Sequence, residues 1–192
     1  MDTIDLGDCT KPIEINCYAD INFKALLDDY RHHFSRKLLI VETNYKALAE
    51  FSIVFNEKDL PHLMGWDKIM GKKKSAKFIC GLIDKNQLTV ESSKKHSRFN
   101  EAKKRMLNYN FIHDCFLHNT QNVCVMTKSM KPNPLNLDIV FYREGKREAV
   151  VLGLRKDLKS GLYVPTTLHN KNINCEYNRR ARTKVNKTYW KL

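Results

Sequence analysis

The segment "LDIVFYREGKREAVVLGLRK", residues 137–156, decides the fold class. Two runs rich in β-branched and aromatic residues, which favour strands, are separated by a charged stretch around Gly145. This pattern predicts an antiparallel hairpin. The segments "VCVMTKS" at 123–129 and "GLYVPTTLH" at 161–169 are further short β-type runs on either side. Together the four runs predict a four-stranded antiparallel sheet in the C-terminal half of the chain.

The earlier part of the chain has mainly helical spacing. Residues 20–36 place apolar side chains three or four positions apart, which predicts an amphipathic helix. Residues 38–43 and 47–55 follow as the two strands of a hairpin, and the second strand alternates between apolar and polar side chains. The sequence predicts three more helices, over residues 57–70, around residues 78–83 and over residues 98–117. Because helices and later strands are segregated along the chain, we expect the α+β class.

Length and composition fit one domain. The chain has 192 residues, and its hydrophobic content of 42% is enough for a core. We expect an N-terminal extension over residues 1–19, a single α+β domain over residues 20–177 and a basic tail over residues 178–192. The first ten residues lack the regions of a secretory signal, and no apolar run approaches the roughly 20 residues that span a bilayer. The expected location is the cytoplasm, with no membrane contact.

The charge balance points to a polyanionic partner. Lys and Arg number 34 against 21 Asp and Glu, for a net charge of +13. Nucleic acid is the first candidate for such a partner, and an anionic membrane surface is the second. The cysteines form no C-x-x-C pair, and the offsets between His113, Cys115 and His118 do not share one face of a helix. We therefore expect no metal site and no cofactor.

Four segments carry a resemblance to a known family. They are "DLPHLMGW" (59–66), "SRFNEAKKRM" (97–106), "LDIVFYREGKREAVVLGL" (137–154) and "YVPTTLH" (163–169). After a leading helix and hairpin, this series resembles the phage-associated branch of the Barnase/EndoU/colicin/RelE-like ribonucleases, the BECR fold. The resemblance covers most of the chain.

The resemblance implies a metal-independent endoribonuclease of toxin type, or of phage or mobile-element effector type. Such proteins are often held by an acidic antitoxin or immunity protein. In this reaction the 2′-hydroxyl of RNA attacks the adjacent phosphorus. The enzyme must remove a proton from that hydroxyl, donate one to the leaving 5′-oxygen and stabilise the added negative charge.

Five residues form the candidate catalytic set. His62 and His169 carry the side chain that transfers protons near neutral pH. Thr166 and Thr167 can hold a phosphate oxygen, and Arg155 can donate two parallel hydrogen bonds to it. Each also has a structural interpretation. His62 would be a packed residue at a helix start, His169 a loop residue, the threonines ordinary strand residues and Arg155 a solvated strand end.

The candidate RNA-binding residues lie at two strand ends and in the basic tail. They are Lys128, Lys156, Arg179, Arg180, Arg182, Lys184 and Lys187. Clustered cations neutralise phosphates, and Tyr189 and Trp190 can stack on unpaired bases. The alternative is a solvated tail that only keeps the protein soluble. Two other functions stay open: a non-catalytic nucleic-acid-binding regulator, and an interaction module that docks an acidic partner.

Overall fold

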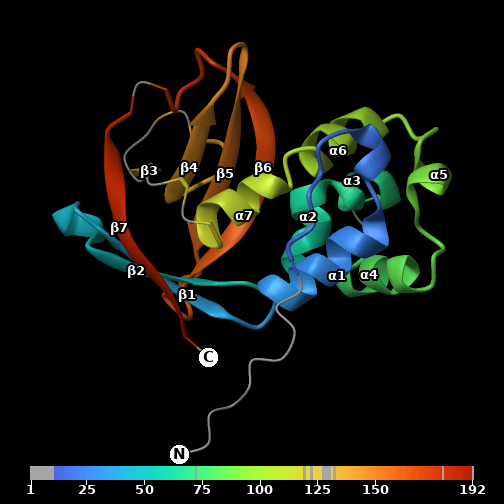
Figure 1. The fold of residues 1–192 in the computed structure, drawn as a ribbon, viewed down its shortest axis with the longest axis horizontal. Helices are drawn as coiled ribbons and strands as arrows, with labels where there is room; N and C mark the ends of the chain where they lie inside the picture. Colours follow the sequence, from blue (N-terminus) through green and yellow to red (C-terminus); the bar gives the residue numbers. More distant parts are fainter. Residues whose placement is uncertain are drawn as a thin grey trace, which may run out of the picture.

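A computed structural model describes residues 11–71, 73–118, 120–121, 123–126, 131, 133–178 and 180–191. A curved sheet forms one side of the molecule, most helices gather on the other side, and α7 lies across the sheet (Figure 1). This arrangement confirms the α+β class.

The helices are short, and two of the predicted ones are interrupted. Their bounds are η1 (Tyr18–Asp20), α1 (Phe23–His33), η2 (Lys46–Leu48), η3 (Glu57–Asp59), α2 (Leu60–Met64), α3 (Trp66–Met70), α4 (Ala76–Asp84), α5 (Val90–Ser93), α6 (Phe99–Met106) and α7 (Asn110–Phe116). The helix predicted over residues 57–70 is divided by Gly65, whose φ of 75° is left-handed and ends α2. The helix predicted over residues 98–117 is divided because Asn108 donates its side-chain amide to the carbonyl of Lys104 at 2.7 Å, in a turn between α6 and α7.

The sheet has seven strands in the described part of the chain, so the prediction of four was wrong. They are β1 (Leu38–Thr43), β2 (Glu50–Val54), β3 (Val123–Met126), β4 (Ile139–Glu144), β5 (Glu148–Lys156), β6 (Tyr163–Asn172) and β7 (Arg182–Lys191). Their order is β1-β2-β6-β5-β4-β3-β7, closed by pairing of β7 with β1. All neighbours are antiparallel except β2 and β6, which meet in parallel at Ile53 and Tyr163.

Two segments enlarge the sheet beyond the predicted strands. The N-terminal hairpin of β1 and β2 belongs to the same sheet rather than lying apart from it. The basic segment at the C-terminal end forms β7, which pairs with both β1 and β3. Val185 of β7 is buried, whereas Lys184 and Lys187 are exposed. One side of β7 is therefore buried, which the basic composition of the segment does not indicate.

A β-bulge in β6 sets the positions of the side chains that follow it. Pro165 lies opposite Leu154 and Thr167 lies opposite Gly153, so Thr166 has no partner across the ladder. A Cβ at Gly153 would lie 2.5 Å from Leu137 and 3.0 Å from Thr167. Only glycine therefore lets Thr167 and the Leu137 loop approach β5 this closely.

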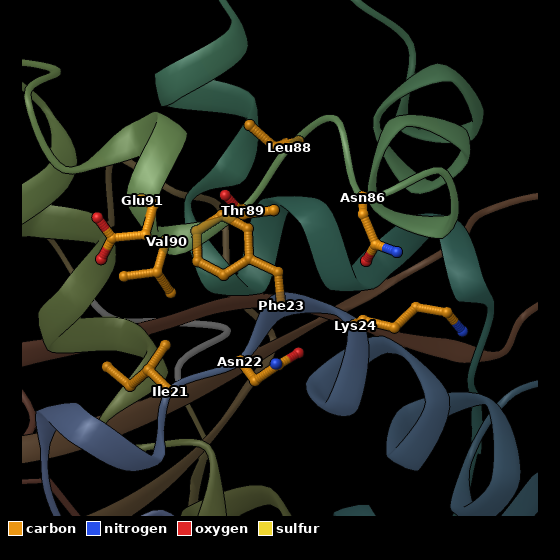
Figure 2. Close-up of a pocket in the computed structure, with 9 residues that line it drawn as sticks. All are labelled: Ile21, Asn22, Phe23, Lys24, Asn86, Leu88, Thr89, Val90 and Glu91. Carbon is orange, nitrogen blue, oxygen red and sulfur yellow. The ribbon is translucent and has the colours of Figure 1, made fainter.

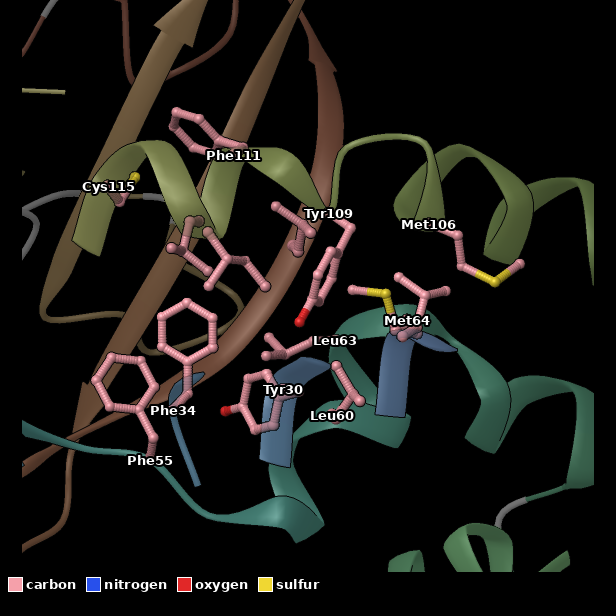
Figure 3. Packing of buried hydrophobic residues seen from close by; sticks show 14 of the residues in the cluster. Tyr30, Phe34, Phe55, Leu60, Leu63, Met64, Met106, Tyr109, Phe111 and Cys115 are labelled. Atoms are coloured by element: carbon pink, nitrogen blue, oxygen red, sulfur yellow. The ribbon is translucent and has the colours of Figure 1, made fainter. Parts of the chain in front are cut away.

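The core joins the helices to the sheet through α2 and α7. Leu60, Leu63 and Met64 of α2 are buried beside Tyr30 of α1 (Figure 3). Trp66, which follows Gly65, is also fully buried, and its indole N–H lies 3.3 Å from the sulfur of Met106. Burial of side chains of this size stabilises each by about 1.5–3 kcal/mol. The packing fixes α2 and α3 against α6, leaving one side of α2 free.

Candidate active site

An open cleft of about 530 Å³ lies between helices α2, α3 and α6 and strands β5 and β6. Helices contribute His62, Lys68 and Arg105, and β6 contributes Thr167 and His169. Three of the five candidate catalytic residues thus line one cleft, although they come from segments about a hundred residues apart.

His62 points away from the core and is held by a carboxylate. Its side chain is 53% exposed, and its Nδ1 lies 2.8 Å from Oδ2 of Asp67 on α3. Pro61 and Leu63, its neighbours on α2, are buried. A carboxylate on Nδ1 favours the tautomer with the proton on Nδ1, so that Nε2 is free to accept a proton. His62 is therefore a surface imidazole with a fixed orientation.

Asp67 is ionised in this arrangement. Burial alone raises the pKa of the Asp67 carboxyl, but the hydrogen bond from His62 and the charge of Arg105 hold it below its usual value. One of its oxygens, Oδ1, is buried and has no hydrogen-bond partner in the described structure. The negative charge of Asp67 is thus directed mainly to His62, and it would stabilise the imidazolium form.

Arg105 forms the floor of the cleft. It is only 7% exposed, its Nη1 donates to the carbonyl of His62 at 3.0 Å, and its Nη2 lies 3.5 Å from Glu101. Burial lowers the pKa of its guanidinium, although Glu101 and Asp67 oppose this effect. Its Nε has no partner among the described residues. A buried, fixed guanidinium of this kind can stabilise charge that develops on a bound anion.

Ion pairs and amide hydrogen bonds hold the rim. Lys68 pairs with Glu101, and Lys104 lies 3.3 Å from Glu148. Asn170 of β6 donates to Glu148 at 2.8 Å. Hydrogen bonds from Asn170 and Lys104 lower the pKa of Glu148, which is ionised at neutral pH. The rim thus ties α6 to β5 and β6 and sets the width of the cleft.

Thr167 and His169 form a second polar pair across the cleft from the helices. Both side chains lie on β6, and Oγ1 of Thr167 lies 2.9 Å from Nδ1 of His169. Burial, reinforced by the charges of Arg105 and Lys171, lowers the pKa of His169 to about 4. His169 is therefore neutral at physiological pH, unlike a histidine that acts as a proton donor.

The other two candidate catalytic residues do not line this cleft. Thr166 lies in the bulge, and its hydroxyl donates to the carbonyl of Val164 at 3.2 Å. Arg155 lies at the end of β5, where its Nη2 donates to the carbonyl of Leu135 at 2.5 Å. Leu135 itself lines the cleft, so Arg155 supports the wall of the cleft from outside.

The candidate RNA-binding residues are spread along the sheet. Lys156 has its ammonium 5.8 Å from the ring centre of Tyr163, and Arg180 donates to the carbonyl of Glu176 at 3.3 Å. Arg182, Lys184 and Lys187 are exposed on β7. Lys128 and Arg179 lie outside the described residues.

Sequence reasoning missed Asp67, Arg105 and Lys68. Asp67 lies five positions after His62, a spacing that brings them together only because Gly65 turns the chain between α2 and α3. Arg105 belongs to the basic run of α6 and looks solvent-facing by charge alone. The one sequence signal for this arrangement was Gly65, a glycine inside a helical pattern. The structure explains it: a Cβ at Gly65 would lie 3.2 Å from Cδ of Arg105.

Another hollow lacks this chemistry. It lies between the start of α1 and the segment that joins α4 to α5 (Figure 2). Two of its polar side chains cap helices: Asn22 accepts from the N–H of Ala25 at 3.0 Å, and Thr89 accepts from the N–H of Ser92 at 3.2 Å. The residues that line it include no histidine and no arginine. The cleft beside His62 is the stronger candidate.

Two further features of the described residues concern metals and membranes. Within the described ranges, no three His, Cys, Asp or Glu side chains are grouped as ligands for a metal ion. His113, near Cys115 in the sequence, instead has its Nε2 2.7 Å from Asp29 in the core. None of the helices that the structure describes has the length and apolarity needed to cross a bilayer.

Comparison with known proteins agrees with the architecture. The chain matches the family model described as phage-Barnase-EndoU-ColicinE5/D-RelE-like nuclease 4 over residues 24–191. The match spans every residue of the cleft and includes β7, and it confirms the resemblance found in the sequence. Searches of curated proteins and of solved structures found no match.

Proposed function

The chain belongs to this phage-associated nuclease family, and on that premise we propose that the cleft beside His62 cuts RNA through the 2′-hydroxyl, without a metal ion. The observation that carries the proposal is the exposed His62, fixed by Asp67, above the buried guanidinium of Arg105. These groups can remove the proton of the 2′-hydroxyl and stabilise the added negative charge, two of the three requirements of the reaction.

His62 is the general base in this proposal. Its Nε2 accepts the proton of the 2′-hydroxyl while the 2′-oxygen bonds to phosphorus and the bond to the 5′-oxygen breaks. The charge of Asp67, 2.8 Å from Nδ1, stabilises the imidazolium that forms. The leaving 5′-oxygen takes a proton from water in the open cleft, and the imidazolium of His62 returns its extra proton to the hydroxide that remains. The products are a 2′,3′-cyclic phosphate and a 5′-hydroxyl end.

Arg105, Lys68 and Lys104 stabilise the negative charge that grows on the phosphoryl oxygens. Arg105 needs no rearrangement for this task, because burial and its bond to the carbonyl of His62 already fix it. The Lys68 and Lys104 ammonium groups lie on the rim, where their carboxylate partners hold them in place. Charges held in place before the reaction contribute more than flexible ones.

The Thr167–His169 pair binds the phosphate rather than transferring protons. In this role neutral His169 accepts a hydrogen bond from the Thr167 hydroxyl at Nδ1 and carries its ring proton on Nε2. That N–H then donates to a phosphate oxygen at any pH well above 4. This role differs from the acid–base role that the sequence alone predicts for His169.

The exposed cations Lys156, Arg182, Lys184 and Lys187 are the proposed contacts for the rest of the RNA strand. Each phosphate contact that is lost should reduce the slope of log affinity against log salt by about 0.7 for single strands. Affinity of the catalytically inactive protein for an RNA oligonucleotide, measured over a range of salt, tests this. An unchanged slope in Lys184→Gln/Lys187→Gln would remove β7 from the RNA path.

The test of the proposed function is cleavage of RNA by purified protein in EDTA. We expect fragments that end in 2′,3′-cyclic phosphate, and no cleavage of the same sequence as DNA, which lacks the attacking hydroxyl. RNA that stays intact at micromolar protein, with or without added divalent metal, would leave a nucleic-acid-binding role instead. Expression of wild type and His62→Gln in cells tests the toxin role, because only the wild type should arrest growth.

A further inference from the structure

Helix α4 carries a glycine that its own fold does not require. Gly81 lies in the middle of α4, and a Cβ added there would meet no atom within 4 Å. Its φ is not in the left-handed region, unlike that of Gly65, so alanine fits its backbone conformation. Glycine is less favourable than alanine inside a helix. The described structure therefore gives no intramolecular reason for glycine at this position.

The missing side chain leaves a hollow on the outer face of α4. The hollow measures about 340 Å³ and is lined by Lys77, Phe78, Gly81, Leu82 and Lys85, with Ser75 at its end. Positions four apart share one face of a helix, so these residues form a continuous stripe. Phe78 is 46% exposed, and with Leu82 it gives the hollow an apolar floor.

Unpaired cations surround this floor. Lys73, Lys74, Lys77 and Lys85 are exposed and make no ion pair with any carboxylate of the described residues. The ammonium of Lys74 lies 4.9 Å from the centre of the Phe78 ring. The rim of the cleft differs, because its lysines have carboxylate partners within the chain.

The acidic residue of α4 cannot neutralise the groove. Asp84 is held 2.7 Å from Arg31 of α1, and Lys24 lies 3.6 Å from the same carboxylate. The groove also shares no lining residue with the cleft. Figure 1 shows α4 at the edge of the helical layer opposite α6. The groove on α4 is therefore a surface separate from the cleft beside His62.

We propose that this groove docks an acidic amphipathic helix of another protein. The gap above Gly81 allows the backbone of a partner helix to approach closely, while Phe78 and Leu82 cover its apolar residues. Lys77 and Lys85 are eight residues apart, about 12 Å along α4, which matches acidic residues seven or eight apart on the partner. The net charge of +13 disfavours a second copy of this chain as the occupant. The inference does not depend on the nuclease activity.

RNA is the competing occupant, and it fits the groove less well. Phosphates would bind the lysines, but a polynucleotide has no need for the gap at Gly81. A base stacked on Phe78 would also compete with the ammonium of Lys74 for the ring. The two occupants therefore differ in how they respond when the gap is filled.

The experiment measures binding of three labelled probes by fluorescence anisotropy. The probes are a synthetic helical peptide with glutamates seven positions apart beside leucines, a scrambled peptide of equal composition, and a single-stranded RNA oligonucleotide methylated at its 2′-oxygens, which the proposed reaction cannot cut. We expect the amphipathic peptide to bind the wild type at least tenfold more tightly than the scrambled peptide does. Gly81→Leu should lower the affinity for the amphipathic peptide at least tenfold and leave the circular dichroism spectrum of the protein unchanged.

Charge variants provide a second, independent arm. Lys77→Gln/Lys85→Gln should also lower the affinity for the amphipathic peptide. Lys146→Gln/Lys159→Gln, which removes the same charge from turns of the sheet, should leave that affinity unchanged. Equal affinity of wild type and Gly81→Leu for the peptide would overturn the proposal. So would equal binding of the scrambled peptide, or perturbation of the Phe78 and Gly81 amide NMR signals by RNA and not by the peptide.

Discussion

Arg105 of α6 donates a hydrogen bond to the main-chain carbonyl of His62 at 3.0 Å, although the two residues are 43 positions apart. The bond spans the helix break at Gly65 and couples the position of α2 to that of α6. It uses Nη1, while Nη2 lies 3.5 Å from Glu101 at the floor of the cleft. The same side chain therefore orients the imidazole-bearing helix and presents positive charge to the cleft.

Arg105→Lys should lower the cleavage rate by about 10²-fold, because an ammonium cannot hold His62 and face the phosphate at once. It should also lower the free energy of unfolding by about 2 kcal/mol, the usual effect of losing a buried hydrogen bond. Single-turnover cleavage and urea unfolding measure the two effects. The matched control is Arg98→Lys: Arg98 lies 3.4 Å from the same Glu101 but is 65% exposed. Equal effects of the two substitutions would contradict the assigned role.

His62→Gln should reduce the rate by about 10²- to 10⁴-fold, the usual contribution of a positioned general base. Asp67→Asn keeps the shape of the hydrogen-bond partner of His62 and removes its charge, so it should lower the cleavage rate at least about tenfold. Rates are compared with those of His32→Gln, which removes an exposed histidine of α1 and should retain full activity. Full activity of His62→Gln would exclude His62 as the base.

Gly65→Ala should destabilise the protein by about 1–3 kcal/mol and lower activity as well. Its φ of 75° disfavours any Cβ, and that Cβ would lie 3.2 Å from Arg105 and 3.3 Å from Ala102. The control is Gly161→Ala, at the same φ of 75° but with no atom within 4 Å of the added Cβ. Thermal unfolding of both separates backbone strain from the clash with α6. The contact explanation requires Gly65→Ala to be the more harmful of the two.

His169 should make stability fall as the pH drops from 6.5 to 4. Its folded pKa of about 4 lies below the ordinary value of 6.5, so over this range the unfolded chain binds a proton that the folded chain does not. Stability therefore rises with pH across this window and is unaffected by His169 above it. Across the whole window, His169 should change the free energy of unfolding by about 3 kcal/mol.

Urea unfolding of wild type and His169→Gln between pH 4 and pH 7.5 measures this effect. The variant should show a weaker dependence on pH, whereas His96→Gln, which removes an exposed histidine, should follow the wild type. Parallel curves for wild type and His169→Gln would mean that the imidazole of His169 titrates normally in the folded protein.

The sequence predicted the elements whose apolar residues repeat at helical or strand spacing within a short segment. Apolar spacing located α1, and the runs on either side of Gly145 located β4 and β5. It was less informative for β7, because Arg182, Lys184 and Lys187 dominate its composition. The residues that face inward from β7, such as Val185, have partners on β1, which no local pattern identifies.

The candidate site was predictable in part for the same reason. His62 and His169 stood out by residue type, and Thr167 by its place in a strand. Asp67 and Arg105 did not stand out, because their roles depend on the turn at Gly65 and on burial against α6. Arg155 was placed by assuming that strand ends converge, but the bulge at Thr166 and the Leu135 loop separate it from the cleft.

The closing strand ties completion of the sheet to the synthesis of β7. Strand β7 lies between β1 and β3, and the side-chain amide of its Asn186 donates to Oδ1 of Asn44, 142 positions earlier, at 2.7 Å. Until residues 182–191 leave the ribosome, β1 and β3 each present an unpaired edge. In a nascent chain the sheet would thus stay open until β7 emerges. Under the proposed function, RNA cleavage would therefore begin only after β7 has been synthesised.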